Sequence, residues 1–279
     1  LALGAESVPS LSSDEATLIK SLDPDRLSVR QTRALRAQIL AGYDPLGEAF
    51  CRIFSASDRR SAGATYTPGP IVQAMVDWAA QGAVPKRIID PGSGSARFAV
   101  ASGHAFKRAE IVAVELDPLA ALLSRANLAA TRLSKRSRVV LADYRDFRPD
   151  SIDGDSLYIG NPPYVRHHKI EAEWKSWLQE EASGRGLRAS QLAGLHVHFF
   201  LATAIKAQPG DRGVFVTSSE WLDVNYGRLV RELVLDGLGG QAIHVVAPEA
   251  QPFEDAQTTA AITCFEIGSK PSSVRLRRV

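Results

Sequence analysis

The sequence predicts an α/β fold in which helices cover both faces of a mostly parallel sheet. Seven short apolar runs are typical of strands, and longer segments with apolar residues at helical spacing separate them. Strands that alternate with helices are joined by crossovers and therefore lie parallel. The expected strands are residues 87–90, 110–115, 137–141, 155–160, 213–217, 242–246 and 259–267, the last of them antiparallel.

The expected helices occupy the intervals between and before these strands. Up to about residue 53 the patterns are helical, which predicts a helical N-terminal extension. Thr67 and Pro68 predict the N-cap and first position of a helix that ends near residue 81. Helices are also expected over residues 98–104, 118–133, 190–208 and 226–236. Ligands of such a sheet bind at the carboxyl ends of its strands.

Composition limits the function classes. A length of 279 residues with 45% hydrophobic residues fits one large α/β domain, or one domain with an appendage. Lys and Arg (33) nearly balance Asp and Glu (31), and the net charge of +2 argues against a surface devoted entirely to phosphates. Cys51 and Cys264 are too few for a disulfide framework or a cysteine-based zinc site, and no metal is expected. No apolar run is long enough for a membrane helix.

A glycine turn, residues 90–95 (Asp-Pro-Gly-Ser-Gly-Ser), follows the first expected strand. A dinucleotide site would continue as G-x-G-x-x-G, but Arg97 occupies the third position, and no phosphate-loop pattern is present. Asp90 would repel a pyrophosphate and suits a ligand with positive charge. S-adenosylmethionine, with a sulfonium and an ammonium group, is such a ligand. The plain alternative is a tight strand-to-helix turn that needs glycine for its backbone.

Two further acidic residues follow the second and third strands. Glu115 is placed to accept hydrogen bonds from ribose hydroxyls, and Asp143 is placed to accept one from an adenine amine. Ordinary capping of strand ends is the alternative for each residue alone. Three acids at three adjacent strand ends favour S-adenosylmethionine over NAD.

An asparagine turn, residues 161–164 (Asn-Pro-Pro-Tyr), follows the fourth strand and predicts the reaction. The lone pair of an aromatic or amide NH2 group is delocalised, so this nitrogen is a poor nucleophile. The side-chain oxygen of Asn161 and the carbonyl of Pro162 provide two acceptors for its hydrogens, and the prolines hold them in place. Tyr164 offers a ring face to a planar base. Orientation and electrostatics then lower the barrier.

These motifs, in this order, resemble those of gamma-class N6-adenine DNA methyltransferases of restriction–modification systems, with an Eco57I-like or TaqI-like catalytic domain. The match begins at Thr65-Tyr66-Thr67-Pro68, and residues 161–166 (NPPYVR) are similar to the Eco57I-like branch. The resemblance implies a Rossmann-like, S-adenosylmethionine-dependent methyltransferase fold with a seven-stranded sheet. It implies cofactor contacts from Thr67, Asp90, Gly92, Gly94, Glu115, Asp143 and Tyr144. It implies catalytic roles for Asn161, Pro162 and Tyr164, and contacts with the target base or DNA from Pro163, Arg166, His167 and Phe253.

The implied activity is methyl transfer from S-adenosylmethionine to the N6 amine of a flipped-out adenine in duplex DNA. Two alternatives stay open: methylation of an amino group in RNA or of a protein glutamine, and a cofactor-binding subunit whose partner performs the chemistry. For His167, a solvated basic loop is the competing interpretation. A restriction–modification enzyme would work in the cytoplasm of a bacterial or archaeal cell.

The expected domain organisation has three parts. Residues 1–58 form the helical extension, residues 59–269 the catalytic domain, and residues 270–279 a basic tail. The chain begins at Leu1 without an initiator Met, which indicates a trimmed sequence. Since the family motifs end near residue 267, the target-recognition domain usual in this family is expected to lie outside this chain, with the basic tail as its start.

Overall fold

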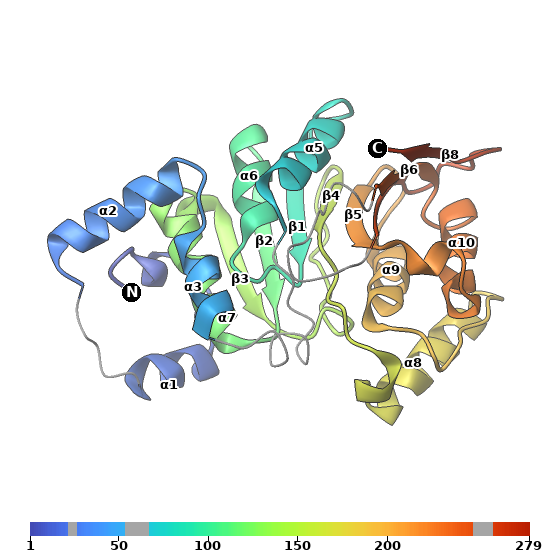
Figure 1. The fold of residues 1–279 in the computed structure, drawn as a ribbon, viewed down its shortest axis with the longest axis horizontal. Coiled ribbons are helices and arrows are strands. Elements are labelled where there is room, and N and C mark those ends of the chain that lie inside the picture. Colours follow the sequence, from blue (N-terminus) through green and yellow to red (C-terminus); the bar gives the residue numbers. More distant parts are fainter. Residues whose placement is uncertain (22–26, 54–66, 248–258) are drawn as a thin grey trace.

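A computed structural model describes residues 1–21, 27–53, 67–247 and 259–279. Its centre is a twisted eight-stranded sheet in the order β3-β2-β1-β4-β5-β7-β6-β8 (Figure 1). Strands β1 to β5 run parallel, β7 pairs antiparallel with both β5 and β6, and β8 pairs parallel with β6. The strand bounds are β1 Arg87–Pro91, β2 Glu110–Glu115, β3 Ser137–Leu141, β4 Ser156–Gly160, β5 Arg212–Ser218, β6 Gly240–Val246, β7 Ala260–Glu266 and β8 Arg275–Arg278.

The seven predicted strands and the antiparallel place of β7 are confirmed. The structure adds β8, formed by Arg275–Arg278, where the sequence predicted only a basic tail. The N–H of Val279 donates to the carbonyl of Val245 at 2.9 Å, and the N–H of Ala247 donates to Val279 at 2.7 Å. Backbone bonds to the open edge of β6 therefore form this strand. All residues of β8 are exposed, so the sequence shows no alternation of apolar and polar residues that would have predicted this strand. Its charged side chains are typical of an edge strand.

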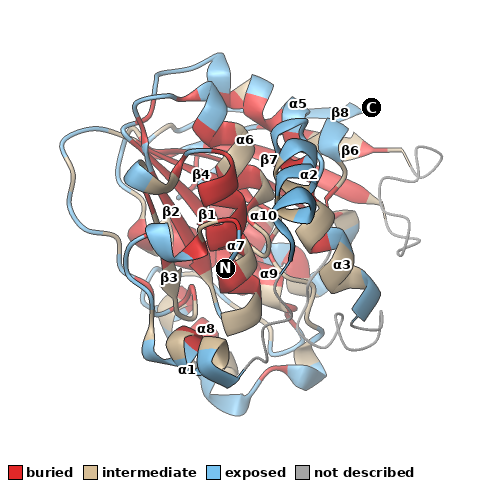
Figure 2. Ribbon diagram, turned by 90° about the vertical axis from the view of Figure 1, so that its left-hand side faces the viewer, coloured by how far each residue is buried: buried red, intermediate tan, exposed pale blue. Residues whose placement is uncertain are grey.

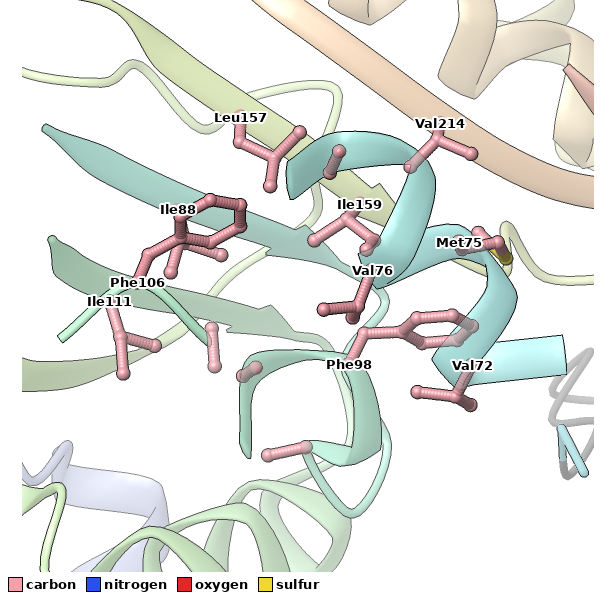
Figure 3. Close-up of a cluster of buried hydrophobic side chains, with 14 of the residues drawn as sticks. Val72, Met75, Val76, Ile88, Phe98, Phe106, Ile111, Leu157, Ile159 and Val214 are labelled. Atoms are coloured by element: carbon pink, nitrogen blue, oxygen red, sulfur yellow. The ribbon is translucent and has the colours of Figure 1, made fainter. Parts of the chain in front are cut away.

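Helices cover both faces of the sheet, as predicted (Figure 2). One face carries α5 (Gly69–Ala80), α6 (Arg97–Ala105) and α7 (Pro118–Ala130), and the other carries α8 (Ala172–Ser183), α9 (Leu195–Lys206) and α10 (Arg228–Leu235). Alternate strand residues supply the two cores: Ile88 and Leu157 face α5 and α6 (Figure 3), whereas Ile89 and Tyr158 belong to the opposite cluster. The sheet is thereby buried on both sides, which holds the strand ends rigid.

The helical N-terminal extension packs against the sheet domain through α7. It contains η1 (Ala5–Ser7), α1 (Ser13–Ser21), α2 (Val29–Leu40) and α3 (Pro45–Ile53). Arg125 of α7 is completely buried and donates to Glu15, also completely buried, with an Nε–Oε1 distance of 2.5 Å. The same guanidinium donates to the carbonyls of Val8, Pro9 and Ser10. A single cation therefore holds the first turns of the chain against the sheet domain.

The start of α5 differs from the prediction. Pro68, not Thr67, is the N-cap residue, and no side chain caps this helix end. Thr67 is nevertheless buried, and its hydroxyl accepts a hydrogen bond from another part of the chain, as described below. No helix in the described ranges is both long and apolar enough to cross a bilayer.

Candidate active site

The glycine turn and the asparagine turn meet where the strand order reverses. β1 lies between β2 and β4, so the turns that follow β1 and β4 flank the switch point of the sheet. A Cβ atom on Gly160, the last residue of β4, would lie 3.1 Å from Oδ1 of Asp90. A Cβ atom on Gly92 would lie 3.4 Å from Cδ of Pro163. These two glycines allow the turns to approach closely enough to form one site.

The backbone of the glycine turn is left-handed at Gly92 (φ 68°) and at Gly94 (φ 54°), a conformation that favours glycine. The N–H groups of Gly92 and Ser93 donate to the carbonyl of Val114 at 2.9 and 3.0 Å. The N–H of Gly94 donates to Oε2 of Glu115 at 2.7 Å. The turn is thus fastened to the end of β2, which brings two of the predicted cofactor-binding positions together.

Asp90 is fully buried at the end of β1. Its Oδ2 accepts a hydrogen bond from the N–H of Ala99 at 2.9 Å, whereas Oδ1 has no hydrogen-bond partner among the described residues. Burial raises the pKa of this carboxyl well above its ordinary value, and the neighbouring charge of Glu115 raises it further. A cationic ligand group that donates a hydrogen bond to Oδ1 would offset the free-energy cost of burying this carboxylate.

Glu115 ends β2 and is half-buried. Its Oε1 accepts hydrogen bonds from the N–H groups of Leu116 and Asp117 at 2.8 and 3.0 Å, beside the bond from Gly94 to Oε2. Burial raises the pKa of this carboxyl, although the backbone bonds act in the opposite direction. Because a carboxylate offers about four lone-pair directions, acceptor capacity remains for a ligand hydroxyl.

Asp143 follows β3 and forms a two-point ion pair with Arg145. Nε and Nη2 of Arg145 lie 2.9 and 2.6 Å from the two carboxylate oxygens. Burial raises the pKa of Asp143, but the bonds from Arg145 outweigh burial and hold the pKa below its ordinary value. The guanidinium carbon of Arg145 lies 3.6 Å from the ring centre of Trp174 on α8. Asp143 is therefore ionised and oriented, and Trp174 packs against the guanidinium that holds it.

The side chain of Tyr144 belongs to the core beneath α9. It is 2% exposed, its hydroxyl lies 2.9 Å from the hydroxyl of Thr203, and its ring packs against Phe199 with the centroids 4.9 Å apart. The structure thus gives this predicted cofactor-binding residue a packing role for its side chain.

Asn161 follows β4, and its amide is oriented by Thr67. Nδ2 of Asn161 donates to Oγ1 of Thr67 at 3.0 Å. Because the amide nitrogen is committed to Thr67, Oδ1 points to the opposite side of the amide.

The asparagine turn continues with Pro162, which is buried, and ends at Tyr164, which is half-buried. Burial raises the pKa of Tyr164, and its hydroxyl has no hydrogen-bond partner in the part of the chain that is described.

The residues after the asparagine turn form a basic corner. Arg166 is exposed and precedes η3 (His167–Lys169), and the His167 ring meets the His168 ring edge-on at 5.6 Å between centroids. Phe253, the predicted second aromatic at the target base, lies outside the described residues.

Asp44 and Arg97 are site residues that sequence reasoning missed. Asp44 precedes α3 and is 4% exposed; it accepts hydrogen bonds from the Ser95 hydroxyl in the glycine turn and from Nδ2 of Asn127 at 3.0 Å. Oδ2 of Asp44 also lies 3.4 Å from Nε of Arg97. The sequence marks Asp44 only as a helix-ending residue and Arg97 only as a departure from a dinucleotide motif. No local signal connects two residues so far apart in the chain.

Comparison with known proteins agrees with this geometry. Residues 156–246 match the family model described as Eco57I restriction-modification methylase. The Type II methyltransferase M.XamI of Xanthomonas campestris pv. amaranthicola is 47% identical over 276 residues, which cover 96% of this chain and 51% of that protein. The Type II methyltransferase M.AccI of Acinetobacter calcoaceticus is 26% identical over 215 residues, which cover 76% of this chain and 38% of that protein. The chain therefore spans about half the length of these relatives, or less.

A solved structure shows the same fold. The methyltransferase subunit of the type I restriction-modification system from Streptococcus thermophilus superposes with a TM-score of 0.64 at 16% identity, covering 77% of this chain and 47% of that one. The fold is that of Rossmann-like, S-adenosylmethionine-dependent methyltransferases, a class whose cofactor is S-adenosylmethionine. Within the class, the chain is related to the Eco57I-type restriction–modification methylases, which confirms the resemblance predicted from its motifs.

Proposed function

We propose that this chain transfers the methyl group of S-adenosylmethionine to the N6 amine of a flipped-out adenine in DNA. The observation that carries the proposal is the close approach of the two turns at the switch point of the sheet: Gly160, which precedes Asn161, lies against Asp90, and Pro163 lies against Gly92. A methyl donor bound by the glycine turn would then lie next to the acceptors of the asparagine turn. Two relatives named as Type II methyltransferases support DNA as the substrate.

The residues present fit the cofactor. The carboxylate oxygen of Asp90 without a hydrogen-bond partner among the described residues suits the ammonium group. Glu115 has acceptor capacity for the ribose, and Asp143 is held at the next strand end, where the adenine amine is expected. In the proposed arrangement Gly92 and Gly94 border the methionine part, and Thr67 lies near its carboxylate.

The proposed reaction is a direct methyl transfer. The lone pair of the adenine nitrogen forms the new N–C bond while the S–C bond of the cofactor breaks, which leaves S-adenosylhomocysteine. The nitrogen then loses one proton to water. Oδ1 of Asn161 and the carbonyl of Pro162 accept hydrogen bonds from the two amine hydrogens, which makes the lone pair available and stabilises the charge that develops on nitrogen.

The base must leave the duplex to reach this site. Tyr164 would stack on one face of the adenine and Phe253 on the other, replacing part of the stacking lost from the duplex. Pro163 would border the base, while Arg166 and His167 would contact neighbouring phosphates. We also propose that a target-recognition region outside this chain supplies sequence specificity, since both Type II relatives are about twice as long or longer.

Label transfer from tritiated S-adenosylmethionine tests the substrate class. Duplex DNA, single-stranded RNA and a protein acceptor with exposed glutamines are incubated in parallel with the purified chain, and with the longest protein that its gene encodes. The proposal predicts label in DNA. Label in RNA or protein without label in DNA would contradict it, as would cofactor binding by calorimetry with no transfer to any acceptor, which would indicate a binding subunit.

Asp90→Asn should weaken cofactor binding and reduce its dependence on pH. The cofactor ammonium attracts the ionised carboxylate, so the affinity of the unmodified chain should rise as pH rises through the elevated pKa of Asp90. The same elevated pKa means that ionised Asp90 destabilises the unliganded fold as pH rises. Asp90→Asn should therefore raise the unfolding temperature of the protein without cofactor. The further rise in unfolding temperature on adding cofactor should be smaller than in the unmodified protein.

Calorimetric titration and thermal unfolding at several pH values between 5 and 8 measure both effects. A residual slope is expected from Glu115, whose pKa is also raised by burial. Equal affinity of both proteins at every pH would contradict the role assigned to Asp90.

A further inference from the structure

A chain of contacts joins the N-terminal extension to Asn161 across four separate segments. It begins at Asp44, before α3, whose Oδ2 lies 3.4 Å from Nε of Arg97 at the start of α6. Nη1 of Arg97 donates to the backbone carbonyl of Thr67, ahead of α5. The hydroxyl of Thr67 then accepts the hydrogen bond from Nδ2 of Asn161 at 3.0 Å.

Residues along this chain of contacts are themselves fixed by burial or by further hydrogen bonds. Asp44 is 4% exposed and also accepts hydrogen bonds from the N–H of Gly47 at 2.9 Å and from Asn127 at 3.0 Å. Thr67 is 2% exposed. Asp44, just before α3, and Arg97, at the start of α6, therefore fix the position of the Thr67 backbone, and with it the position of the hydroxyl.

The contact with Thr67 holds the Asn161 amide with its nitrogen toward Thr67 and its oxygen on the opposite side. The terminal torsion of asparagine is broad, so sterics alone do not distinguish the amide oxygen from the amide nitrogen. In the structure Oγ1 of Thr67 accepts from Nδ2. In the turned amide the same hydroxyl would donate to Oδ1 and so withdraw that oxygen from the adenine amine. Only the observed orientation leaves Oδ1 on the opposite side, where an amine hydrogen can be accepted.

We propose that Asp44, Arg97 and Thr67 are positioning residues that fix the Asn161 amide with Oδ1 toward the acceptor amine. The inference rests on the proposed function, because it assigns Oδ1 the task of accepting that hydrogen. It adds a second task for Thr67 beyond its expected contact with the cofactor. It also links the N-terminal extension to the reaction indirectly, since Asp44 belongs to that extension and acts through Arg97 and Thr67.

The first test observes the amide itself and needs no substrate. Asparagine occurs at three positions, Asn127, Asn161 and Asn225, so 15N-asparagine labelling gives three side-chain amide pairs. The pair that disappears in Asn161→Ser is assigned to Asn161. Thr67→Val, which removes the hydroxyl and keeps the shape, should shift and broaden this pair, and Thr67→Ser should restore it. An unchanged Asn161 pair in Thr67→Val would overturn the proposal.

The second test separates orientation from cofactor binding. At saturating cofactor, Thr67→Val should lower the single-turnover rate by about 10-fold to 100-fold, the effect of one well-placed hydrogen bond. Thr67→Ser should recover most of that loss. Arg97→Met should lower the rate in the same way, with partial recovery in Arg97→Lys. A rate that returns to the unmodified value once cofactor is saturating would overturn the proposal, since Thr67 would then serve the cofactor alone.

Thr263→Val is the matched control. Thr263 is fully buried in β7, and its hydroxyl has no hydrogen-bond partner within the described ranges, so this variant makes the same chemical change outside the chain of contacts. Its transfer rate and its Asn161 amide pair should be those of the unmodified protein. If the unmodified protein methylates no acceptor, the proposed function fails by itself, while the amide spectra still decide whether Thr67 orients Asn161.

Discussion

Asn161→Ala should lower the rate of methyl transfer by about 10²–10³-fold, the effect of removing one preorganised group that stabilises a transition state. Its Oδ1 is the side-chain acceptor proposed for the amine, and alanine offers none. Affinity for S-adenosylmethionine should change by less than about threefold, or under 1 kcal/mol, because the acids proposed to hold the cofactor stand on other strands. Single-turnover transfer and calorimetric titration measure the two effects on the same protein.

The matched control is Asn225→Ala, which makes the same change at an exposed residue of η5 (Asn225–Gly227). It should transfer at the unmodified rate. Full activity in Asn161→Ala would show that Asn161 takes no part in the reaction. An equal loss of transfer rate in both variants would point to a general effect on folding.

Arg125→Met should produce the largest loss of stability. The change leaves Glu15 buried without the cation that donates to it at 2.5 Å, and it also removes donors from three carbonyls of the N-terminal segment. Breaking a buried ion pair by removing one partner typically costs about 3–5 kcal/mol. Urea unfolding at pH 7 measures the loss, and Arg228→Met in an exposed helical ion pair should cost less than about 1 kcal/mol.

The double variant Arg125→Met with Glu15→Gln measures the energetic coupling between these two side chains. Its loss should be smaller than the sum of the two single losses, because the second change removes the charge that the first leaves unpaired. Although burial raises the pKa of Glu15, the bonds from Arg125 and Ser12 hold it below its ordinary value. The stability that Glu15 contributes is therefore present above its unfolded pKa and is lost as pH falls through the folded pKa. Additive losses would show that the pair is not coupled.

Much of the fold could be predicted because its information is local. The apolar runs that became β1 to β7 are buried in the sheet, and the expected helical segments became α5, α6, α7, α9 and α10. β8 could not be predicted, since all its side chains are exposed and its backbone bonds depend on the open edge of β6. Thr67 was given a local role as an N-cap, whereas its hydroxyl is bonded to Asn161 far away in the chain.

The candidate site was predictable to the extent that short motifs place residues at strand ends. The carboxyl ends of β1, β2 and β4 meet at one edge of the sheet. Asp90 and Glu115 lie at the ends of β1 and β2, and Asn161 directly follows β4, so their place in the strand order alone brings them together. The partners that orient them follow no such rule. Arg145 holds Asp143 from within the same turn and is fixed by Trp174, which belongs to a helix further along the chain. Asp44 reaches the glycine turn from the N-terminal extension.

Nucleoside analysis of the methylated product tests the central claim most directly. The chain, or the longest protein its gene encodes, is expressed in a bacterial host that lacks its own DNA methyltransferases, with Asn161→Ala as the control. The host DNA is digested to nucleosides and examined by mass spectrometry. The proposed reaction predicts N6-methyl-2′-deoxyadenosine in cells with the unmodified protein and its loss with Asn161→Ala. N4-methyl-2′-deoxycytidine in its place, or N6-methyladenine at equal levels in both, would contradict the account.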